Sequence, residues 1–120
     1  WQVPYDQLAY YLNSAEIYVS TSKSDGSSMS LLEAMACRLP VVVSDVPANC
    51  EWVKDGANGY LVPRGKVNPI SEKVLALLND RALAEKMGNI NLSIVNERAD
   101  LEKNYPKFDS IYEQMVQSEN

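Results

Sequence analysis

The chain has 120 residues, of which 46% are hydrophobic and 22% charged, and its formal net charge is −5. These values are typical of one globular domain, and they exclude a disordered chain and a chain long enough for two domains. The acidic balance argues against nucleic acid as a partner. With no histidine and only two cysteines, the sequence also excludes the usual zinc sites and catalytic machinery built on histidine.

The hydrophobic pattern alternates between short strands and helices. It predicts helices over residues 5–13, 28–37 and 68–79, a helical turn near 51–53, and amphipathic helices around 83–94 and 108–115. Asn68 and Pro69 predict the N-cap and first residue of the third helix. Strands are predicted over residues 16–20, 41–43 and 60–62, and the valines at 41–43 are typical of a strand buried on both faces.

The alternation of strands and helices predicts an α/β fold with a parallel sheet and right-handed crossovers. Three short strands are few for a doubly wound sheet. We therefore expect the chain to be part of a larger sheet.

The polar loop at residues 21–27 and the helix after it are the most informative segment about function. In open parallel sheets, ligands bind beyond the carboxyl ends of the strands, where this loop lies. Backbone N–H groups over residues 26–29 can approach an anion there, and a helix amino terminus adds about half a positive charge. Lys23 is the only basic residue nearby in the sequence. A bound phosphate would therefore rely on backbone amides and on cations from outside this chain.

Glu33 is the charged residue of a helix that is otherwise apolar on nearly every side, so its carboxylate needs a partner. It lies roughly 7–8 Å along the helix axis from the helix start. A nucleoside diphosphate with its phosphates at the amino terminus would place its ribose near this point, where a carboxylate accepts hydrogen bonds from the ribose diol. Alternatively, Ser30 and Glu33 form a capping box, in which Glu33 only caps the helix. The pattern leaves both interpretations open.

A set of linked motifs resembles the C-terminal domain of retaining GT-B glycosyltransferases of the GT4 type: SDGSSMSLLEAMACRLP over residues 24–40, then VVVSDVP, EWVKDG, NGYLVP and a helix that ends in LLND. The resemblance runs over about residues 1–112, in the family's order. It implies a Rossmann-like parallel sheet with flanking helices, as a partial C-terminal domain of a GT-B fold. Residues 1–105 would form the second half of the donor-binding domain, and residues 106–120 a C-terminal helix.

The resemblance also implies roles for individual residues. Glu33 would bind the ribose hydroxyls, and Asp25 would act at the donor sugar as the catalytic residue, positioning its hydroxyls or supporting the developing charge. The implied donor-binding residues are Asp25, Gly26, Ser27, Ser28, Met29, Ser30 and Glu33, with the backbone amides of residues 28–30 on the diphosphate. No metal and no cofactor are implied, since the nucleoside-diphosphate sugar is the donor substrate. Arg38 stands where the family usually has glycine, at a helix C-cap that favours the left-handed conformation.

The implied activity is hexosyl transfer from a nucleoside-diphosphate sugar to a hydroxyl acceptor, with retention at the anomeric carbon. In the family, the acceptor site and the basic residues for the donor phosphates lie on parts that would precede Trp1. We therefore expect this chain to be inactive without the missing N-terminal part. The alternative is a non-catalytic nucleotide-sugar-binding or structural partner domain. The base stays open among UDP, GDP and ADP.

Further expectations concern location, partners and modification. We expect a cytoplasmic protein, and leave open peripheral membrane association through the missing domain and homo-oligomerisation through an exposed sheet edge. Cys37 and Cys50 are expected to be free thiols. Asn91 begins a glycosylation acceptor pattern but lies in a predicted helix, so we do not expect it to be modified.

Overall fold

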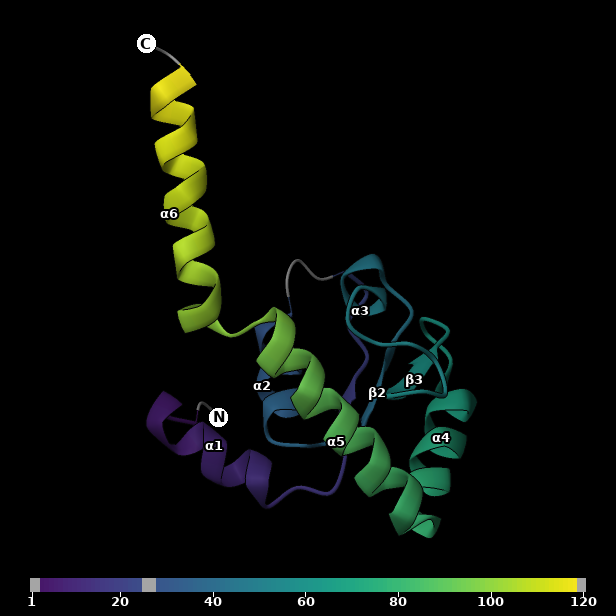
Figure 1. Cartoon of the computed structure of the whole chain (residues 1–120). Helices are drawn as coiled ribbons and strands as arrows, with labels where there is room; N and C mark the ends of the chain where they lie inside the picture. Colours follow the sequence, from purple (N-terminus) through teal and green to yellow (C-terminus); the bar gives the residue numbers. More distant parts are fainter. Residues whose placement is uncertain (1–2, 25–27, 119–120) are drawn as a thin grey trace.

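The structure, a computed structural model, describes residues 3–24 and 28–118 (Figure 1). Within these ranges, three parallel strands form one sheet in the order β1-β2-β3: β1 (Tyr18–Ser20), β2 (Val41–Ser44) and β3 (Gly59–Val62). Tyr18 pairs with Val41, and Val41 pairs with Gly59, so the strands start level with one another. A helix follows each strand, and the predicted parallel α/β arrangement is confirmed.

The helices largely follow the predicted ranges: α1 (Tyr5–Asn13), α2 (Met29–Ala36), α3 (Pro47–Cys50), α4 (Val67–Asn79), α5 (Arg81–Arg98) and α6 (Leu101–Ser118). The turn predicted near 51–53 lies earlier, as α3, because Pro47 opens it at the first helical position. The predicted N-cap at Asn68 is wrong, since Lys66 caps α4 and Asn68 lies inside it. Pro69 is tolerated there because the first-turn N–H groups of a helix have no partner in the helix.

Both faces of β2 are buried, as the run of valines predicted. Val41 and Val43 face α2 and the C-terminal half of α5, in a cluster with Leu31 and Met35. Val42 faces the other way, in a cluster with α4 and the N-terminal half of α5 that includes Leu77 and Met87. All three valines are fully buried. Because successive side chains of a strand point to opposite faces of the sheet, β2 contributes to an apolar layer on each face.

A close backbone contact joins α5 to the end of α2. Arg38 follows α2 with a φ of 61°, so the predicted left-handed C-cap is confirmed despite the absence of glycine. Gly88 of α5 lies directly against the carbonyl group of Arg38, where a Cβ atom would overlap the carbonyl oxygen and lie 2.9 Å from the carbonyl carbon. Glycine is therefore required in α5 for α2 to approach so closely.

A buried pair of asparagines lies beside this contact. The Asn91 side chain donates to the Leu39 carbonyl (2.8 Å) and accepts from the Asn58 side chain (2.8 Å). Asn58 also donates to the Trp52 carbonyl (3.0 Å) and accepts from the Lys54 amide (2.8 Å). Asn91 is fully buried, and its side-chain amide is engaged in these hydrogen bonds.

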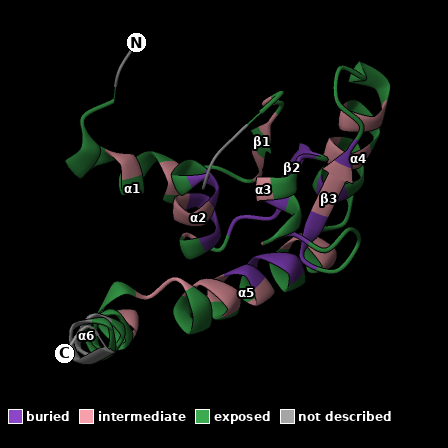
Figure 2. Ribbon diagram, turned by 90° about the horizontal axis from the view of Figure 1, so that it is seen from above, coloured by how far each residue is buried: buried purple, intermediate pink, exposed green. Residues whose placement is uncertain are grey.

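The two ends of the chain are the most exposed parts of the fold. The helix α1 has no buried residue, and α6 projects from the body of the molecule with an exposed apolar stripe that includes Leu101, Tyr105, Phe108 and Ile111 (Figures 1 and 2). None of the described helices combines the length and apolar character needed to cross a membrane. The expected limits of residues 1–105 and 106–120 for the two regions stay a prediction.

Candidate functional site

The carboxyl ends of β1 and β2 are linked by side-chain hydrogen bonds. The Ser44 hydroxyl donates to the Ser20 carbonyl (3.4 Å), and the Ser20 and Ser22 hydroxyls lie 3.2 Å apart. From this edge the chain leads towards α2. Asp25, Gly26 and Ser27, which the sequence singled out, lie outside the described residues. The catalytic role expected of Asp25 stays a prediction.

The amino terminus of α2 brings together the next three expected residues. Ser28 is the N-cap and is buried, with only 4% of its surface exposed, whereas Met29 and Ser30 are exposed in the first turn. Within the described residues, no side-chain oxygen caps this terminus. The first N–H groups of a helix have no partner within it and carry the positive end of the dipole. This end of α2 can therefore accept an anion through its backbone.

The capping-box interpretation of Ser30 and Glu33 is wrong. That motif needs Ser30 at the N-cap, whereas α2 begins at Met29 and Ser30 is already helical. The Ser30 hydroxyl is instead hydrogen-bonded to the Tyr18 hydroxyl, 2.8 Å away. Glu33 is thus not used as a cap.

Glu33 lies one turn further along α2 and is partly buried. It borders two depressions, one on each side of the helix. In the part of the chain that the structure describes, no lysine or arginine forms an ion pair with it. The Glu33 charge acts on Cys37, which lies one turn further along the chain. Burial and the Glu33 carboxylate both raise the pKa of the Cys37 thiol. Both cysteines are free, as predicted.

The two depressions differ in size and character. A cleft of about 220 Å³ between α1 and α2 is lined by Tyr5, Leu8, Ala9 and Leu12 opposite Glu33, Ala36 and Cys37. A groove of about 740 Å³ runs between α2, the end of α5 and α6, and is mainly apolar, with Met29, Leu32, Trp52 and Phe108 among its lining residues. Glu33 is therefore an acceptor-only charge beside two mainly apolar depressions, and the larger of the two also includes Arg98 and Lys107 in its lining.

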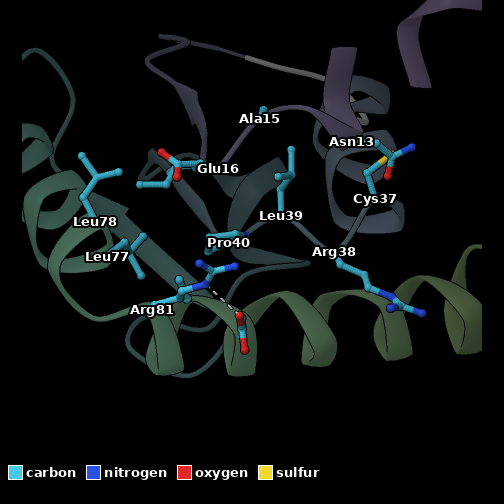
Figure 3. A pocket seen from close by; sticks show the side chains of 13 residues that line it. Asn13, Ala15, Glu16, Cys37, Arg38, Leu39, Pro40, Leu77, Leu78 and Arg81 are labelled. Carbon is cyan, nitrogen blue, oxygen red and sulfur yellow. Dashed lines mark hydrogen bonds and ion pairs between the residues drawn. The ribbon is translucent and has the colours of Figure 1, made fainter. Parts of the chain in front are cut away.

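A third hollow, of about 460 Å³, lies at the amino ends of the strands, opposite the amino terminus of α2 (Figure 3). Its charged lining includes Glu16, Arg38 and Arg81, and Arg81 is paired with Glu85 at 3.1 Å. Across the described ranges, no group of three or more histidine, cysteine or acidic side chains is arranged to hold a metal ion. This hollow thus presents two arginine side chains, whereas the amino terminus of α2 presents backbone N–H groups.

Sequence reasoning missed Arg64. Lys23 was expected to be the only basic residue near the loop, but the Arg64 guanidinium, from the loop after β3, donates to the Lys23 carbonyl (Nη1 to O, 3.4 Å). Arg64 follows the end of β3 by two residues. The rule that parallel strands end at one edge of a sheet could have found it, had it been applied to all three strands.

The chain matches known proteins over most of its length. Residues 1–92 match the family model described as glycosyl transferases group 1. A poly(ribitol-phosphate) α-N-acetylglucosaminyltransferase of Staphylococcus aureus is 34% identical over 79 residues, which are 65% of this chain and 16% of that protein.

Two solved structures extend the similarity to the fold. Sucrose-phosphate synthase from Thermosynechococcus elongatus superposes with a TM-score of 0.92 at 26% identity, over 98% of this chain and 29% of that one. The pneumococcal O-GlcNAc transferase GtfA, in complex with UDP and GlcNAc, superposes with a TM-score of 0.79 at 26% identity, over 91% of this chain and 23% of that one. The chain thus spans less than a third of the length of these three proteins. It belongs to the group 1 glycosyltransferases and corresponds to part of the C-terminal domain of their GT-B fold.

Proposed function

We propose that this chain is the donor-nucleotide half-site of a retaining, GT4-type glycosyltransferase. It binds a nucleoside-diphosphate sugar, with the diphosphate at the amino terminus of α2 and the ribose hydroxyls on Glu33. The whole enzyme, as a cytoplasmic hexosyltransferase, moves the glycosyl group to a hydroxyl acceptor held by the N-terminal domain.

The observation that carries this proposal is the position of Glu33. Its carboxylate lies one turn behind a helix terminus at which no described side chain forms a cap hydrogen bond. It borders two mainly apolar depressions and forms no ion pair with a described lysine or arginine. A partly buried carboxylate is costly unless it accepts hydrogen bonds. The diol of a ribose supplies two hydrogen-bond donors. In a nucleoside diphosphate whose phosphates lie at the helix terminus, the ribose lies about as far from that terminus as Glu33 does. The UDP complex of GtfA supports a nucleoside diphosphate as the ligand class.

The same terminus would assist the chemical step. During transfer, the bond between the anomeric carbon and the diphosphate oxygen breaks, and its electron pair leaves with the diphosphate. The acceptor oxygen bonds to the anomeric carbon and passes its proton to the departing diphosphate. The backbone N–H groups at Ser28, Met29 and Ser30 would stabilise the negative charge that grows on the leaving diphosphate, because they are oriented before the reaction begins.

We assign transfer of the glycosyl group to the whole enzyme, of which this chain is one part. The chain spans only 16% to 29% of the lengths of the three proteins compared with it. We expect the isolated chain to bind nucleotide weakly and to transfer no sugar, because acceptor binding and most phosphate-binding cations belong to the remainder.

The test is a titration of the ¹⁵N-labelled chain with UDP, GDP and ADP, followed through the backbone amide shifts. We expect the shifts to gather at residues 28–33 and one nucleotide to bind more tightly than the other two. Glu33→Gln removes the charge while keeping the size of the side chain. It should weaken binding at least tenfold, since a hydrogen bond to a charged group contributes about 1.5–3 kcal/mol.

Glu72→Gln is the matched control, because Glu72 is exposed on α4 and the same charge is removed. It should leave the affinity unchanged. Shifts that avoid α2, or equal losses in both variants, would contradict the assignment of Glu33 to the ribose. Sugar transfer by the isolated chain would contradict its expected inactivity.

A further inference from the structure

Ser28 is a buried residue whose hydroxyl is not used to cap the helix that it begins. It is the N-cap of α2, its carbonyl oxygen accepts from the Leu32 amide at 3.1 Å, and only 4% of its surface is exposed. The backbone of Ser28 is therefore fixed at the start of the helix. A serine at the N-cap ordinarily turns its hydroxyl back onto an N–H group of the first turn. The Ser28 hydroxyl makes no such bond.

The Ser28 hydroxyl also has no other partner among the residues that the structure describes. The neighbouring hydroxyls are paired elsewhere, Ser30 with Tyr18 at 2.8 Å and Ser20 with Ser22 at 3.2 Å. Within the described ranges, every fully enclosed side-chain nitrogen or oxygen atom has a hydrogen-bond partner. The unpaired Oγ atom of Ser28 is therefore not fully enclosed, and it forms the open tip of an otherwise buried residue.

This arrangement leaves several hydrogen-bond donors together without an acceptor. A hydroxyl donates one hydrogen bond, and the first N–H groups of a helix have no partner within it. A polar group that has lost most of its water and has no protein partner is unfavourable. An acceptor with several oxygen atoms would satisfy the hydroxyl and the N–H groups at once, and a phosphate group is such an acceptor.

We propose that the Ser28 hydroxyl donates directly to a phosphate oxygen of the bound nucleoside diphosphate. This inference rests on the proposed function, in which the backbone of α2 holds the diphosphate, and it adds a side-chain donor to that site. The bond is charge-assisted, so it is stronger than a bond between neutral groups. Because the leaving diphosphate gains negative charge during transfer, the bond strengthens as the glycosyl bond breaks. Ser28 thus recognises the phosphates of the donor, and Glu33 its ribose.

Capping of α2 is the competing role, and it is tested without a ligand. Replacing a capping serine by alanine destabilises a protein, because a first-turn N–H group loses its acceptor. Removing a hydroxyl that has no partner costs nothing and relieves an unpaired polar group. We therefore expect Ser28→Ala, without nucleotide, to unfold at the same urea concentration as the unchanged chain or at a higher one. A lower midpoint would overturn the inference.

Titration of the ¹⁵N-labelled chain with UDP and with uridine, which has the ribose but no phosphate, tests the bond itself. Ser28→Ala should weaken UDP about tenfold, from the loss of one hydrogen bond to a charged group, and should change the uridine affinity by less than about twofold. Glu33→Gln should weaken both ligands. Ser93→Ala, which removes a hydroxyl at an exposed position of α5, should weaken neither. An unchanged UDP affinity in Ser28→Ala, or equal losses for UDP and uridine, would overturn the inference.

Pyrophosphate distinguishes this inference from the proposed function, because it contains the diphosphate without a nucleoside. Its binding, followed through the amide shifts of residues 28–31, should weaken about tenfold in Ser28→Ala. If UDP binds no better than pyrophosphate, the assignment of the ribose to Glu33 fails while the bond from Ser28 stands. Pyrophosphate shifts that are absent from α2, or that are equal in the two chains, would overturn the bond from Ser28.

Discussion

Replacing Gly88 by alanine tests how closely α2 and α5 approach. On an exposed helix this change stabilises, because alanine is favoured over glycine by about 1 kcal/mol. In this fold the new methyl group would overlap the Arg38 carbonyl oxygen and lie 2.9 Å from its carbon. The Arg38 carbonyl belongs to the backbone, so it cannot move away from the methyl group as the end of a flexible side chain could. The two helices must therefore move apart.

The size of the effect follows from what separation of the helices disturbs. Overpacking costs about 1–3 kcal/mol, and the rigid obstacle places Gly88→Ala at the upper end. Separation also stretches the 2.8 Å bond from Asn91 to the Leu39 carbonyl, at a cost of about 1 kcal/mol. After the gain in helix propensity, the free energy of unfolding should fall by about 2–3 kcal/mol. Such a loss is a large fraction of the free energy of unfolding of a typical domain, which is about 5–15 kcal/mol.

Urea unfolding followed by circular dichroism at 222 nm measures this loss as a lower midpoint at unchanged slope. Ser93→Ala is the matched control, since Ser93 is exposed on the same helix and its replacement should stabilise slightly through propensity alone. A urea midpoint of Gly88→Ala at or above that of the wild type would refute the close contact between Gly88 of α5 and the Arg38 carbonyl at the end of α2.

Two further predictions concern buried and titratable groups. Asn91→Ala should lower the free energy of unfolding by about 2–4 kcal/mol in the same urea assay, because it removes one of the two acceptors of the Asn58 amide and leaves the Leu39 carbonyl without its side-chain donor in the interior. Asn89→Ala, exposed on the same helix, should change it little. Asp45→Ala should lower the pKa of the Cys50 thiol, which the hydrogen bond to the Asp45 carboxylate raises. Cys50 should then be alkylated by iodoacetamide faster than in wild type at pH 8, as measured by mass spectrometry of the Cys50 peptide, and an unchanged rate would show that this bond does not form in solution.

The sheet could be predicted from the sequence because its strands carry strong local signals. The valines of β2 indicate burial on both faces, and the turn residues between α3 and β3 mark where the next strand begins. The capped end of α2 at Arg38 was predictable from the family resemblance, although arginine is unusual in that conformation. Local chemistry and the overall fold agree in these elements, which is typical of sequences that specify one structure.

The contacts between distant residues could not be predicted in the same way. The hydrogen bond between Asn58 and Asn91 spans 33 positions, and neither residue has a neighbour in sequence that signals it. In the sequence, Asn58 precedes Gly59 in a pair typical of turns, and Asn91 begins a glycosylation acceptor pattern. The capping box at Ser30 failed for a related reason, because a two-residue motif does not reveal that the helix begins two residues earlier, at Met29. Tertiary packing decides these cases.

The charge of the chain constrains how the proposed donor site works. A chain of net charge −5 repels a nucleoside diphosphate at long range. Attraction must therefore come from groups within a few ångströms, where water and salt screen them least. The amino terminus of α2, at which no described side chain forms a cap hydrogen bond, supplies such groups through its backbone. At the same edge Arg64 donates to the Lys23 carbonyl, and Arg98 and Lys107 are among the residues that line the groove beside Met29 and Glu33. In the proposed site the phosphates meet backbone N–H groups of α2, so recognition by this chain should depend more on the ribose and Glu33 than on the phosphates.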